Sequence, residues 1–339
     1  KRLMRNKLAV AGLVVIVFAI VVSLLGYGIT PDQTPNANDG SVQMQKKKPG
    51  FKVTILKTHK RREVKKQNFL QFLISGQESQ YTTKPIKSYS ITGNTLFSVP
   101  YVRKKKTDEV PLVLVTCPVH NRVSDAFPYD SLKNYTVQND TVLYLDINQQ
   151  IQRITFAELK QTFEENNIEE RTYWLGTDRS GRDFLSRLIL GTRVSLGIGF
   201  VAVLISLILG IGFGAVSGFF GGIVDTLISW LMQVVWSIPG IMLVIVITLA
   251  LGDKSDKNAY ITFIAVGLTM WVEIARVVRG QMMVLKEKLF VQSARAFGLS
   301  NTRIIFYHIM PNMWGAIIVT ATANFAAAII IEAGLSFLG

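Results

Sequence analysis

The sequence is poor in cysteine and histidine, and each shortage excludes a kind of chemistry. Its single cysteine, Cys117, cannot form an intramolecular disulfide or a metal site made of several thiolates. The three histidines, His59, His120 and His308, lie far apart in the sequence, and no H-E-x-x-H motif is present. We therefore expect no metal site and no catalytic residues, and we do not expect an enzyme.

The segment 176–183 (GTDRSGRD) is close to a phosphate-binding loop but lacks the residues that perform its function. Arg182 stands where such a loop has its lysine, and Asp183 stands where it has the hydroxyl that binds Mg²⁺. A carboxylate at that position would repel phosphate. The sequence therefore predicts a turn instead of a nucleotide site. We expect a helix at the membrane surface to follow, with Leu185 and Leu188 on its apolar face.

Charge and hydrophobicity together indicate a membrane protein. Lys and Arg number 37 against 23 Asp and Glu, and hydrophobic residues make up 49% of the chain. These apolar residues are gathered in long runs, unlike those of a soluble domain. A basic balance also occurs in nucleic-acid-binding proteins. The Lys and Arg that collect in the inner loops of a membrane protein account for it equally well.

Five apolar runs are long enough to cross a hydrocarbon core of ~30 Å, which requires about 20 residues. The first run, 8–28, is longer than the ~7–15 apolar residues of a signal peptide, so we interpret it as an uncleaved anchor. The chain then divides into a tail with the first transmembrane helix (1–29), an inserted domain (30–172) and a helical core (173–339). The other predicted crossings are 194–218, 226–251, 259–278 and 314–335.

The inserted domain is predicted to be α+β. Residues 155–167 predict an amphipathic helix with Thr155 at its N-cap and Glu158 three residues later. Basic clusters in this domain are interpreted as a solvated surface, with contact to anionic lipid as the alternative and nucleic acid as a third option. Runs of β-branched and aromatic residues bounded by turn residues predict strands at 51–60, 87–102, 110–120 and 139–148.

The basic residues also predict the orientation of the chain. Lys and Arg collect on the cytoplasmic side of a membrane, so the basic tail 1–7 predicts a cytoplasmic N-terminus in a bacterial inner membrane. The number of crossings then places 30–172 outside the cell and the loop 279–313 inside, and this loop is rich in Lys and Arg. The insert is basic too, but loops longer than ~60 residues translocate largely regardless of charge.

Glycine spacing and one proline predict how the core helices pack. Gly210, Gly214, Gly218 and Gly222 recur every four residues, which places them on one helical face and lets a neighbouring helix approach closely. Pro239 lies within a predicted crossing and predicts a kink, because proline has no backbone N–H. We interpret both features as packing geometry, with a role in a substrate path or in gating as the alternative.

Three ionisable residues fall within predicted crossings. Glu273 and Arg276 are three positions apart, so they share a helical face and can pair. Glu332 lies toward the outer end of the last crossing. A charge at the centre of a bilayer costs ~2.5–3.5 kcal/mol, so pairing or a position near a helix end is the simpler interpretation. A polar path through the membrane is the alternative.

The inner loop predicts a helix, a break and a second helix. Phe290, Ala294 and Phe297 fall at i, i+4 and i+7 and predict one apolar face. Gly298 is placed to end the first helix in a left-handed cap, and Ser300 is placed to cap the next. An apolar face exposed inside the cell requires a cover. The membrane surface, a soluble partner protein or, as a DNA-binding helix-turn-helix, a nucleic acid would supply one.

These segments resemble the permease subunits of ABC importers. Gln292-Ser293-Ala294, three residues, Gly298, nine residues and then His308 to Pro311 match the spacing of the family's loop pattern E-A-A-x3-G-x9-I-x-L-P. Glutamine replaces the glutamate of the pattern, which puts one docking contact in doubt. The similarity is to the C-type subunit of oligopeptide, dipeptide and nickel importers. It extends over 176–196, 221–240, 275–298 and 332–339, in the order found in the family.

The resemblance implies an all-α type I importer fold with six crossings, of which five are present in this sequence and the sixth is missing. It implies four kinds of partner: a second, B-type permease subunit, two ATPases that bind ATP and Mg²⁺, an extracytoplasmic substrate-binding protein, and membrane lipid. No cofactor and no nucleic acid are expected on this chain. The coupling-loop residues implied for ATPase docking are Phe290, Gln292, Ser293, Ala294, Arg295, Ala296, Phe297, Gly298, His308 and Pro311.

Rival interpretations remain at this level. The first is a membrane-anchored binding or scaffold protein whose inserted domain is the working part. The second is a membrane-associated nucleic-acid binder, for which a steep loss of affinity with salt would be typical.

Overall fold

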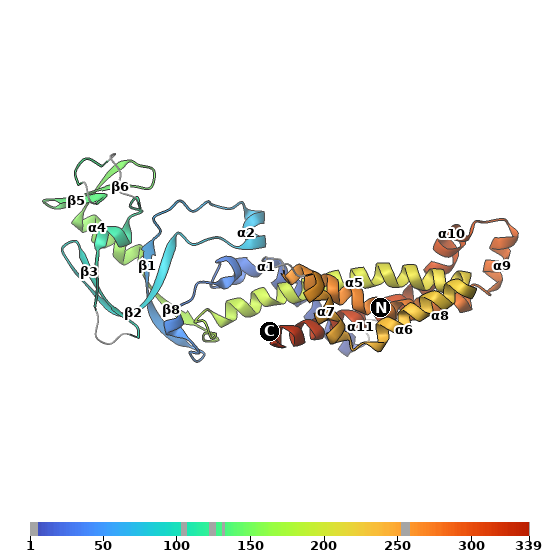
Figure 1. The fold of residues 1–339 in the computed structure, drawn as a ribbon. Helices are drawn as coiled ribbons and strands as arrows, with labels where there is room; N and C mark the ends of the chain where they lie inside the picture. Colours follow the sequence, from blue (N-terminus) through green and yellow to red (C-terminus); the bar gives the residue numbers. More distant parts are fainter. Residues whose placement is uncertain (1–5, 103–106, 122–126, 131–132, 252–257, 339) are drawn as a thin grey trace. The chain divides into compact units, whose positions relative to one another are not determined.

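A computed structural model describes residues 6–102, 107–121, 127–130, 133–251 and 258–338 of the chain (Figure 1). The chain divides into two compact units, 1–193 and 194–339. The basic residues Lys1, Arg2 and Arg5, on which the predicted orientation partly rests, lie outside the described residues.

The first unit contains an antiparallel five-stranded sheet. The strands are β1 (Phe51–His59), β2 (Tyr81–Thr92), β3 (Thr95–Pro100), β4 (Asp108–Pro111) and β8 (Ile168–Tyr173). Their order is β4-β3-β2-β1-β8, and β2 and β3 are joined by a tight turn in which Gly93 has a φ of +57°. The predicted strand at 51–60 is confirmed as β1, whereas the single strand predicted at 87–102 is the end of β2, this turn and β3.

A second, three-stranded sheet and a helix complete the inserted domain. The sheet is formed by β5 (Tyr135–Gln138), β6 (Thr141–Leu145) and β7 (Ile151–Thr155). The helix α4 (Phe156–Asn166) begins with the predicted capping box, in which Thr155 and Glu158 bond to each other's backbone N–H. The strand predicted at 139–148 is confirmed as β6.

The strand predicted at 110–120 is wrong. The structure places β4 up to Pro111 and a short helix, α3 (Leu112–Thr116), after it. Leu112, Val113 and Val115 of this helix are buried in the same core as Leu159 and Phe163 of α4. A short apolar run buried on all sides has no polar face to reveal its period, so strand and helix look alike in the sequence.

The N-terminal part of the first unit is helical. The apolar helix α1 (Lys7–Ile29) is capped by Asn6, whose side chain accepts hydrogen bonds from the backbone N–H groups of Leu8 and Ala9. Two 3₁₀ turns follow, η2 (Pro35–Ala37) and η3 (Val42–Met44), and a short helix, α2 (Phe69–Ser75), lies between β1 and β2. Helix α2 contacts α1.

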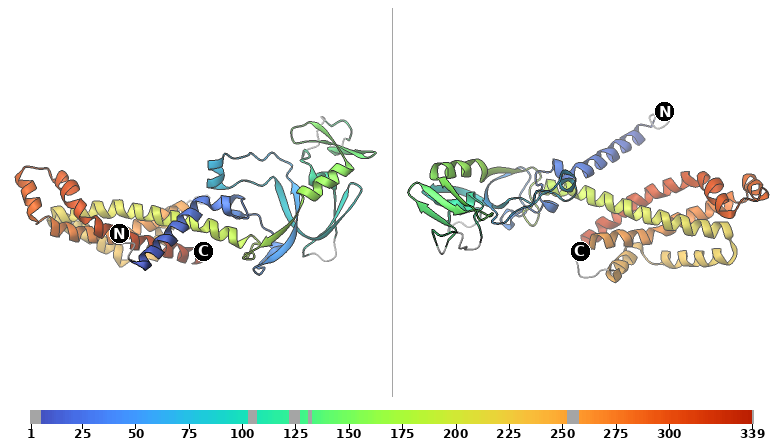
Figure 2. Two further views of the ribbon diagram at one scale, coloured as in Figure 1. Left: turned by 180° about the vertical axis from the view of Figure 1, so that it is seen from behind. Right: turned by 90° about the horizontal axis from the view of Figure 1, so that it is seen from above.

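The second unit is a bundle of helices (Figures 1 and 2). Among the described residues of the whole chain, four helices are long and apolar enough to cross a membrane: α1 of the first unit and three that lie in or extend into the second unit. The number rises to five if one bent pair counts as a single span. The helices are α5 (Phe184–Phe220), which begins in the first unit, α6 (Gly222–Ser237), α7 (Gly240–Leu251), α8 (Asn258–Leu285), α9 (Leu289–Ala296), α10 (Asn301–Arg303), the π-helix η4 (Ile304–Ile309) and α11 (Met310–Leu338).

The single crossing predicted at 226–251 is two helices, because α6 and α7 are bent by 94° relative to each other. The bend lies at Ile238 and Pro239, and Ile238 is extended, with φ −92° and ψ 130°. A residue before proline is disfavoured in the helical conformation, and the proline itself has no N–H for the helix. The predicted kink is therefore a complete break.

Three other helix boundaries differ from the sequence prediction. The surface helix expected after 183 is not separate, because α5 runs without a break for 37 residues. At 1.5 Å per residue α5 is ~55 Å long, well beyond a hydrocarbon core of ~30 Å. Helix α8 continues to Leu285, and α11 begins at Met310. The non-helical part of the predicted loop 279–313 is correspondingly short.

The glycine prediction is confirmed at three of the four positions. A Cβ added at Gly210, Gly214 or Gly218 would lie within 3 Å of the backbone of α8, so α5 and α8 touch through their main chains. The prediction is wrong for Gly222, where an added Cβ would meet nothing within 4 Å. The reason is local: α5 has already ended, and Gly222 has a φ of +56° in the turn to α6.

Candidate functional site

The helix α9 lies at one end of the second unit, beyond the ends of α5 and α8 (Figure 2). Val291 and Ala294 are buried, while Phe290 and Phe297 have exposed fractions of 40% and 86%. The single apolar face predicted for Phe290, Ala294 and Phe297 is therefore not present. Ala294 packs inward and the two phenylalanines face outward. The sequence analysis missed Val291, although its spacing of three from Ala294 is typical of a buried face.

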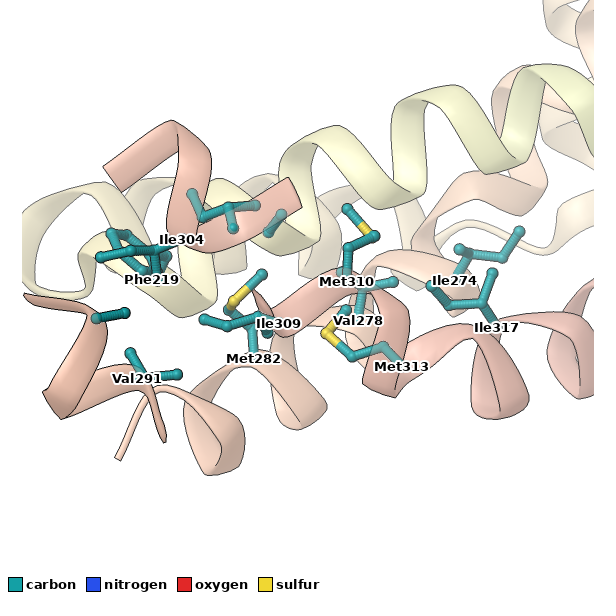
Figure 3. Packing of buried hydrophobic residues seen from close by; sticks show 13 residues of the cluster. Phe219, Ile274, Val278, Met282, Val291, Ile304, Ile309, Met310, Met313 and Ile317 are labelled. Carbon is teal, nitrogen blue, oxygen red and sulfur yellow. The ribbon is translucent and has the colours of Figure 1, made fainter. Parts of the chain in front are cut away.

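The buried side of α9 rests on an apolar cluster shared by several helices. Figure 3 shows these side chains packed together, with Val291 beside Met282 of α8 and Ile309 of η4. A close-packed cluster of this kind is stiff, so α9 is firmly joined to the helices beneath it. The cluster comprises Ala215, Phe219, Ile274, Val278, Met282, Val291, Ala294, Ile304, Ile305, Ile309, Met310, Met313 and Ile317.

Gly298 ends α9 as predicted. Its φ is +74°, in the left-handed region, and its N–H donates to the carbonyl of Arg295 at 2.9 Å. The N–H of Leu299 reaches back to the carbonyl of Ala294 at 3.2 Å. This pair of bonds is a Schellman motif, which reverses the chain direction within two residues. Ser300 occupies the N-cap position of α10, but its side chain makes no capping hydrogen bond.

His308 and Pro311 lie in the segment that joins the loop to α11. The segment Ile304–Ile309 is a π-helix, in which the N–H of Met310 bonds to the carbonyl of Ile305. Pro311 explains this widening, because it offers no N–H to the carbonyl four residues earlier and its ring displaces that carbonyl. The bulge turns Ile304, Ile305 and Ile309 into the cluster under α9. His308 itself is half-buried and Pro311 is exposed.

The other predicted loop residues lie on the exposed side of α9. Gln292, Ser293, Arg295 and Ala296 are all exposed. The amide of Gln292 donates to the carbonyl of Glu287 at 3.1 Å, and the guanidinium of Arg295 lies 5.5 Å from the centre of the Phe219 ring. The exposed side of α9 is therefore a mixed polar and aromatic surface around Phe297.

An ion pair that the sequence analysis missed lies between α6 and α8. Asp225 accepts two hydrogen bonds from Arg279, at 2.6 Å from Nε and 2.7 Å from Nη2. The Ser217 hydroxyl also donates to Asp225, and Lys286 donates to the carbonyl of Gly218 at 2.9 Å. The turn between α5 and α6 is thereby tied to α8, close to the loop. Asp225 and Arg279 are far apart in the sequence, so the pair could not be predicted from their spacing.

The three ionisable residues predicted within crossings are not brought together. Arg276 lies over the ring of Trp236 at 3.8 Å, and no ion pair with Glu273 occurs in the described part of the chain. Cation–π contact with an aromatic ring replaces the predicted pair. Glu332 instead accepts hydrogen bonds from Ser336 at 2.7 Å and Ser195 at 3.4 Å.

The segment 176–183 is a turn, as predicted. The carboxylate of Asp178 accepts from the backbone N–H groups of Ser180 and Arg182 at 2.8 and 2.9 Å, which lowers its pKa. A Cβ at Gly181 would lie 1.8 Å from the carbonyl of Ser41, so the chain packs directly against this turn. Asp183 caps α5 by accepting from the N–H of Ser186 at 2.9 Å.

Within the described residues, no group of three or more His, Cys, Asp and Glu side chains is arranged to hold a metal ion. The candidate functional site of the helical unit is the exposed surface of α9 together with the apolar cluster beneath it.

Comparison with known proteins gives family matches for two parts of the chain. Residues 210–339 match the family described as binding-protein-dependent transport system inner membrane component, and residues 1–49 match the N-terminal TM domain of oligopeptide transport permease C. The chain is 37% identical over 169 residues to the oligopeptide transport system permease protein OppC of Bacillus subtilis (strain 168), covering 50% of this chain and 54% of that protein.

A second relative is the dipeptide transport system permease protein DppC of Alkalihalophilus pseudofirmus, 38% identical over 188 residues, covering 55% of this chain and 60% of that protein. This chain therefore spans little more than half the length of the two relatives. A solved inward-facing structure of the MetNI methionine ABC transporter aligns at 21% identity with a TM-score of 0.38, covering 45% of this chain and 74% of that chain.

Proposed function

We propose that this chain is a permease subunit of an ATP-driven importer, because residues 210–339 match the family described as binding-protein-dependent transport system inner membrane component. It forms half of the translocation pore, and a second permease subunit forms the other half. The relatives are named for oligopeptide and dipeptide transport, so peptides are the proposed cargo. ATP and Mg²⁺ bind to two partner ATPases, where the hydrolysis takes place.

The proposed contact with an ATPase is the exposed side of α9. The observation that carries this proposal is that a short helix presents Phe297, 86% exposed, while its other side is locked into the apolar cluster. A large exposed aromatic side chain on a firmly held element is typical of a protein-binding surface. Gln292, Ser293 and Arg295 supply polar contacts around it.

The packing suggests how a displacement of α9 is transmitted to the membrane-spanning helices. Val291 and Ala294 join α9 to residues of α5, α8, η4 and α11 in one cluster. Because a dense core transmits displacement instead of absorbing it, α9 and these helices would move together. The bidentate pair of Asp225 and Arg279 extends the connection to α6. Closure of the ATPases would in this way rock the pore between inward-facing and outward-facing states.

The proposed orientation follows from the loop. An ATPase contact on α9 requires that end of the unit to lie in the cytoplasm of a bacterial cell, with the N-terminus on the same side. The inserted domain 30–172 would then lie outside the inner membrane, where the binding protein or the second permease subunit is available. A type I importer fold with a sixth crossing beyond this sequence completes the proposal.

The test is whether Phe297 is required for the ATPases to remain bound to the transporter. We expect Phe297→Asp to release the ATPases from the assembled transporter in mild detergent and to abolish peptide uptake by proteoliposomes. The control position is Phe200, another exposed phenylalanine. Because α5 is apolar there, aspartate is unsuitable at this position. The matched pair of variants is therefore Phe297→Ala and Phe200→Ala. Phe200→Ala should retain the ATPases. Retention of the ATPases and of uptake by Phe297→Asp would contradict the proposal.

A further inference from the structure

The segment between β1 and β2 forms an arm that carries α2 at its tip (Figure 1). The side chain of Gln77 holds the two extended segments of this arm together. Its Oε1 accepts from the N–H of Gln67 at 2.9 Å, and its Nε2 donates to the carbonyl of Lys65 at 3.0 Å. These hydrogen bonds therefore hold the arm in a defined conformation and direction.

The tip of the arm is docked on the Ile29 end of α1. Gly76 has a φ of +74°, and an added Cβ would lie 2.7 Å from the ring of Tyr27. The N–H of Gln77 donates to the carbonyl of Gln33 at 3.0 Å, and Phe72 packs into the small cluster that contains Tyr27. Helix α2 is thus held beside the end of an apolar helix long enough to cross a membrane.

The opposite side of α2 is apolar and exposed. Phe69, Leu70 and Ile74 have exposed fractions of 73%, 71% and 65%. Three large apolar side chains on one short helix, turned away from the protein, are costly in water. The neighbouring helix α1 is long and apolar enough to span a membrane, and its Ile29 end would then lie at the boundary between hydrocarbon and water. The apolar surface of α2 would continue that of α1.

The charge of the adjoining chain is basic. In the segment 60–66 (KRREVKK), Lys60 and Arg62 both pair with Glu78, whereas Lys65 and Lys66 are exposed immediately before α2. Lysines beside an exposed apolar helix form the arrangement of a helix that lies in the membrane interface, where the cations meet anionic headgroups.

We propose that α2, together with Lys65 and Lys66, is an interfacial anchor that inserts Phe69, Leu70 and Ile74 into the leaflet on the Ile29 side of α1. Its occupant is an anionic lipid surface. The anchor fixes the direction in which the arm leaves the membrane, because the arm is clamped at Gln77 and at Gly76. The proposal requires α1 to span the membrane and does not depend on transport or on an ATPase contact.

The test is the depth of a spin label at position 70. The native Cys117 is buried, and its pKa is raised to about 11 by burial, so a cysteine introduced by Leu70→Cys is labelled selectively at neutral pH. The chain is placed in nanodiscs of phosphatidylcholine mixed with phosphatidylglycerol. The accessibility of the label to oxygen, which enters lipid, is compared with that to a water-soluble nickel complex.

The matched control is Val137→Cys, at an exposed apolar residue of β5 that lies outside the arm. We expect the ratio of oxygen to nickel accessibility to be several-fold higher at position 70 than at position 137. Adding Lys65→Glu and Lys66→Glu should lower the ratio at position 70, and so should nanodiscs of phosphatidylcholine alone.

Three outcomes would overturn the proposal. A label at position 70 that is as accessible to nickel as the label at position 137 would place the apolar side of α2 in water. A label shielded from both reagents would show that a protein surface covers α2. A ratio that ignores both the lysine changes and the phosphatidylglycerol would refute the anionic lipid as occupant. None of these results bears on whether Phe297 contacts an ATPase, so the two proposals fail separately.

Discussion

Among the glycines of the second unit, Gly214 is the one at which an added Cβ would lie nearest to another helix, so substitution there is a sharp test of the packing. In Gly214→Ala, the new Cβ would lie 2.5 Å from the carbonyl oxygen of Ala275 and 2.8 Å from Cβ of Val278. Ordinary contacts between such atoms are about 3.5–4.0 Å, so α5 and α8 must separate by about 1 Å. Backbone atoms cannot rotate away, so the helices themselves must move.

The expected cost follows from overpacking. Inserting a methyl group into a filled core costs about 1–3 kcal/mol. Replacing glycine by alanine in a helix favours the helix by up to about 1 kcal/mol, which offsets part of that cost. Gly212→Ala separates the two effects, because a Cβ at Gly212 meets nothing within 4 Å in the same helix. We expect Gly214→Ala to be less stable than Gly212→Ala by about 2 kcal/mol.

The assay is thermal unfolding of both variants in one detergent. A difference of this size lowers the midpoint by several degrees in a protein of this length. Equal midpoints for the two variants would refute the reasoning, because they would mean that α5 and α8 do not approach as closely as the structure shows. A lower midpoint for Gly212→Ala would refute it as well.

Three further predictions concern a partly buried ion pair, a helix end and a thiol. Asp225→Asn should lower the stability in detergent by about 1.5–3 kcal/mol, since it weakens two charge-assisted hydrogen bonds from Arg279. Gly298→Ala should cost about 1–2 kcal/mol because its φ of +74° is strained for any residue with a Cβ, and it should loosen α9 as measured by hydrogen exchange. Cys117 should resist maleimide at pH 8 until the chain is unfolded, since burial raises its pKa to about 11.

Each of these three predictions has a result that would contradict it. Unchanged stability of Asp225→Asn would mean that the ion pair contributes no more than an exposed one. Unchanged exchange in α9 of Gly298→Ala would mean that the cap does not control this helix. For Cys117 the sign also matters: the folded pKa lies above the unfolded value, so the thiol's contribution to stability is complete at neutral pH and is lost as pH rises toward 11. Rapid labelling of the native protein would contradict its burial.

Local features were predictable from the sequence because neighbouring residues decide them. The capping box of Thr155 and Glu158 needs only the spacing of two side chains, and the cap at Gly298 needs only a residue free to adopt a positive φ. Pro239 interrupts its helix because it has no N–H. The apolar runs indicated where helices lie, since length and composition alone decide whether a segment can cross a membrane.

Properties that depend on distant parts of the chain were not predictable in this way. The sequence placed Ala294 on an exposed face, but the residues of α8 and η4 that cover it are known only once the chain is folded. The pair of Asp225 and Arg279 joins helices whose spacing in the sequence carries no regularity.

The sequence by itself therefore determined the class of this protein: a chain of membrane-length helices, an α+β insert, and a loop with the spacing of an importer permease. These follow from periodicity, hydrophobicity and turn residues, which act over a few positions. Only the tertiary structure decided which side of α9 is free, which glycines meet another backbone, and which charges pair. Those outcomes depend on contacts between segments far apart in the chain, and such contacts form through packing that local patterns do not encode.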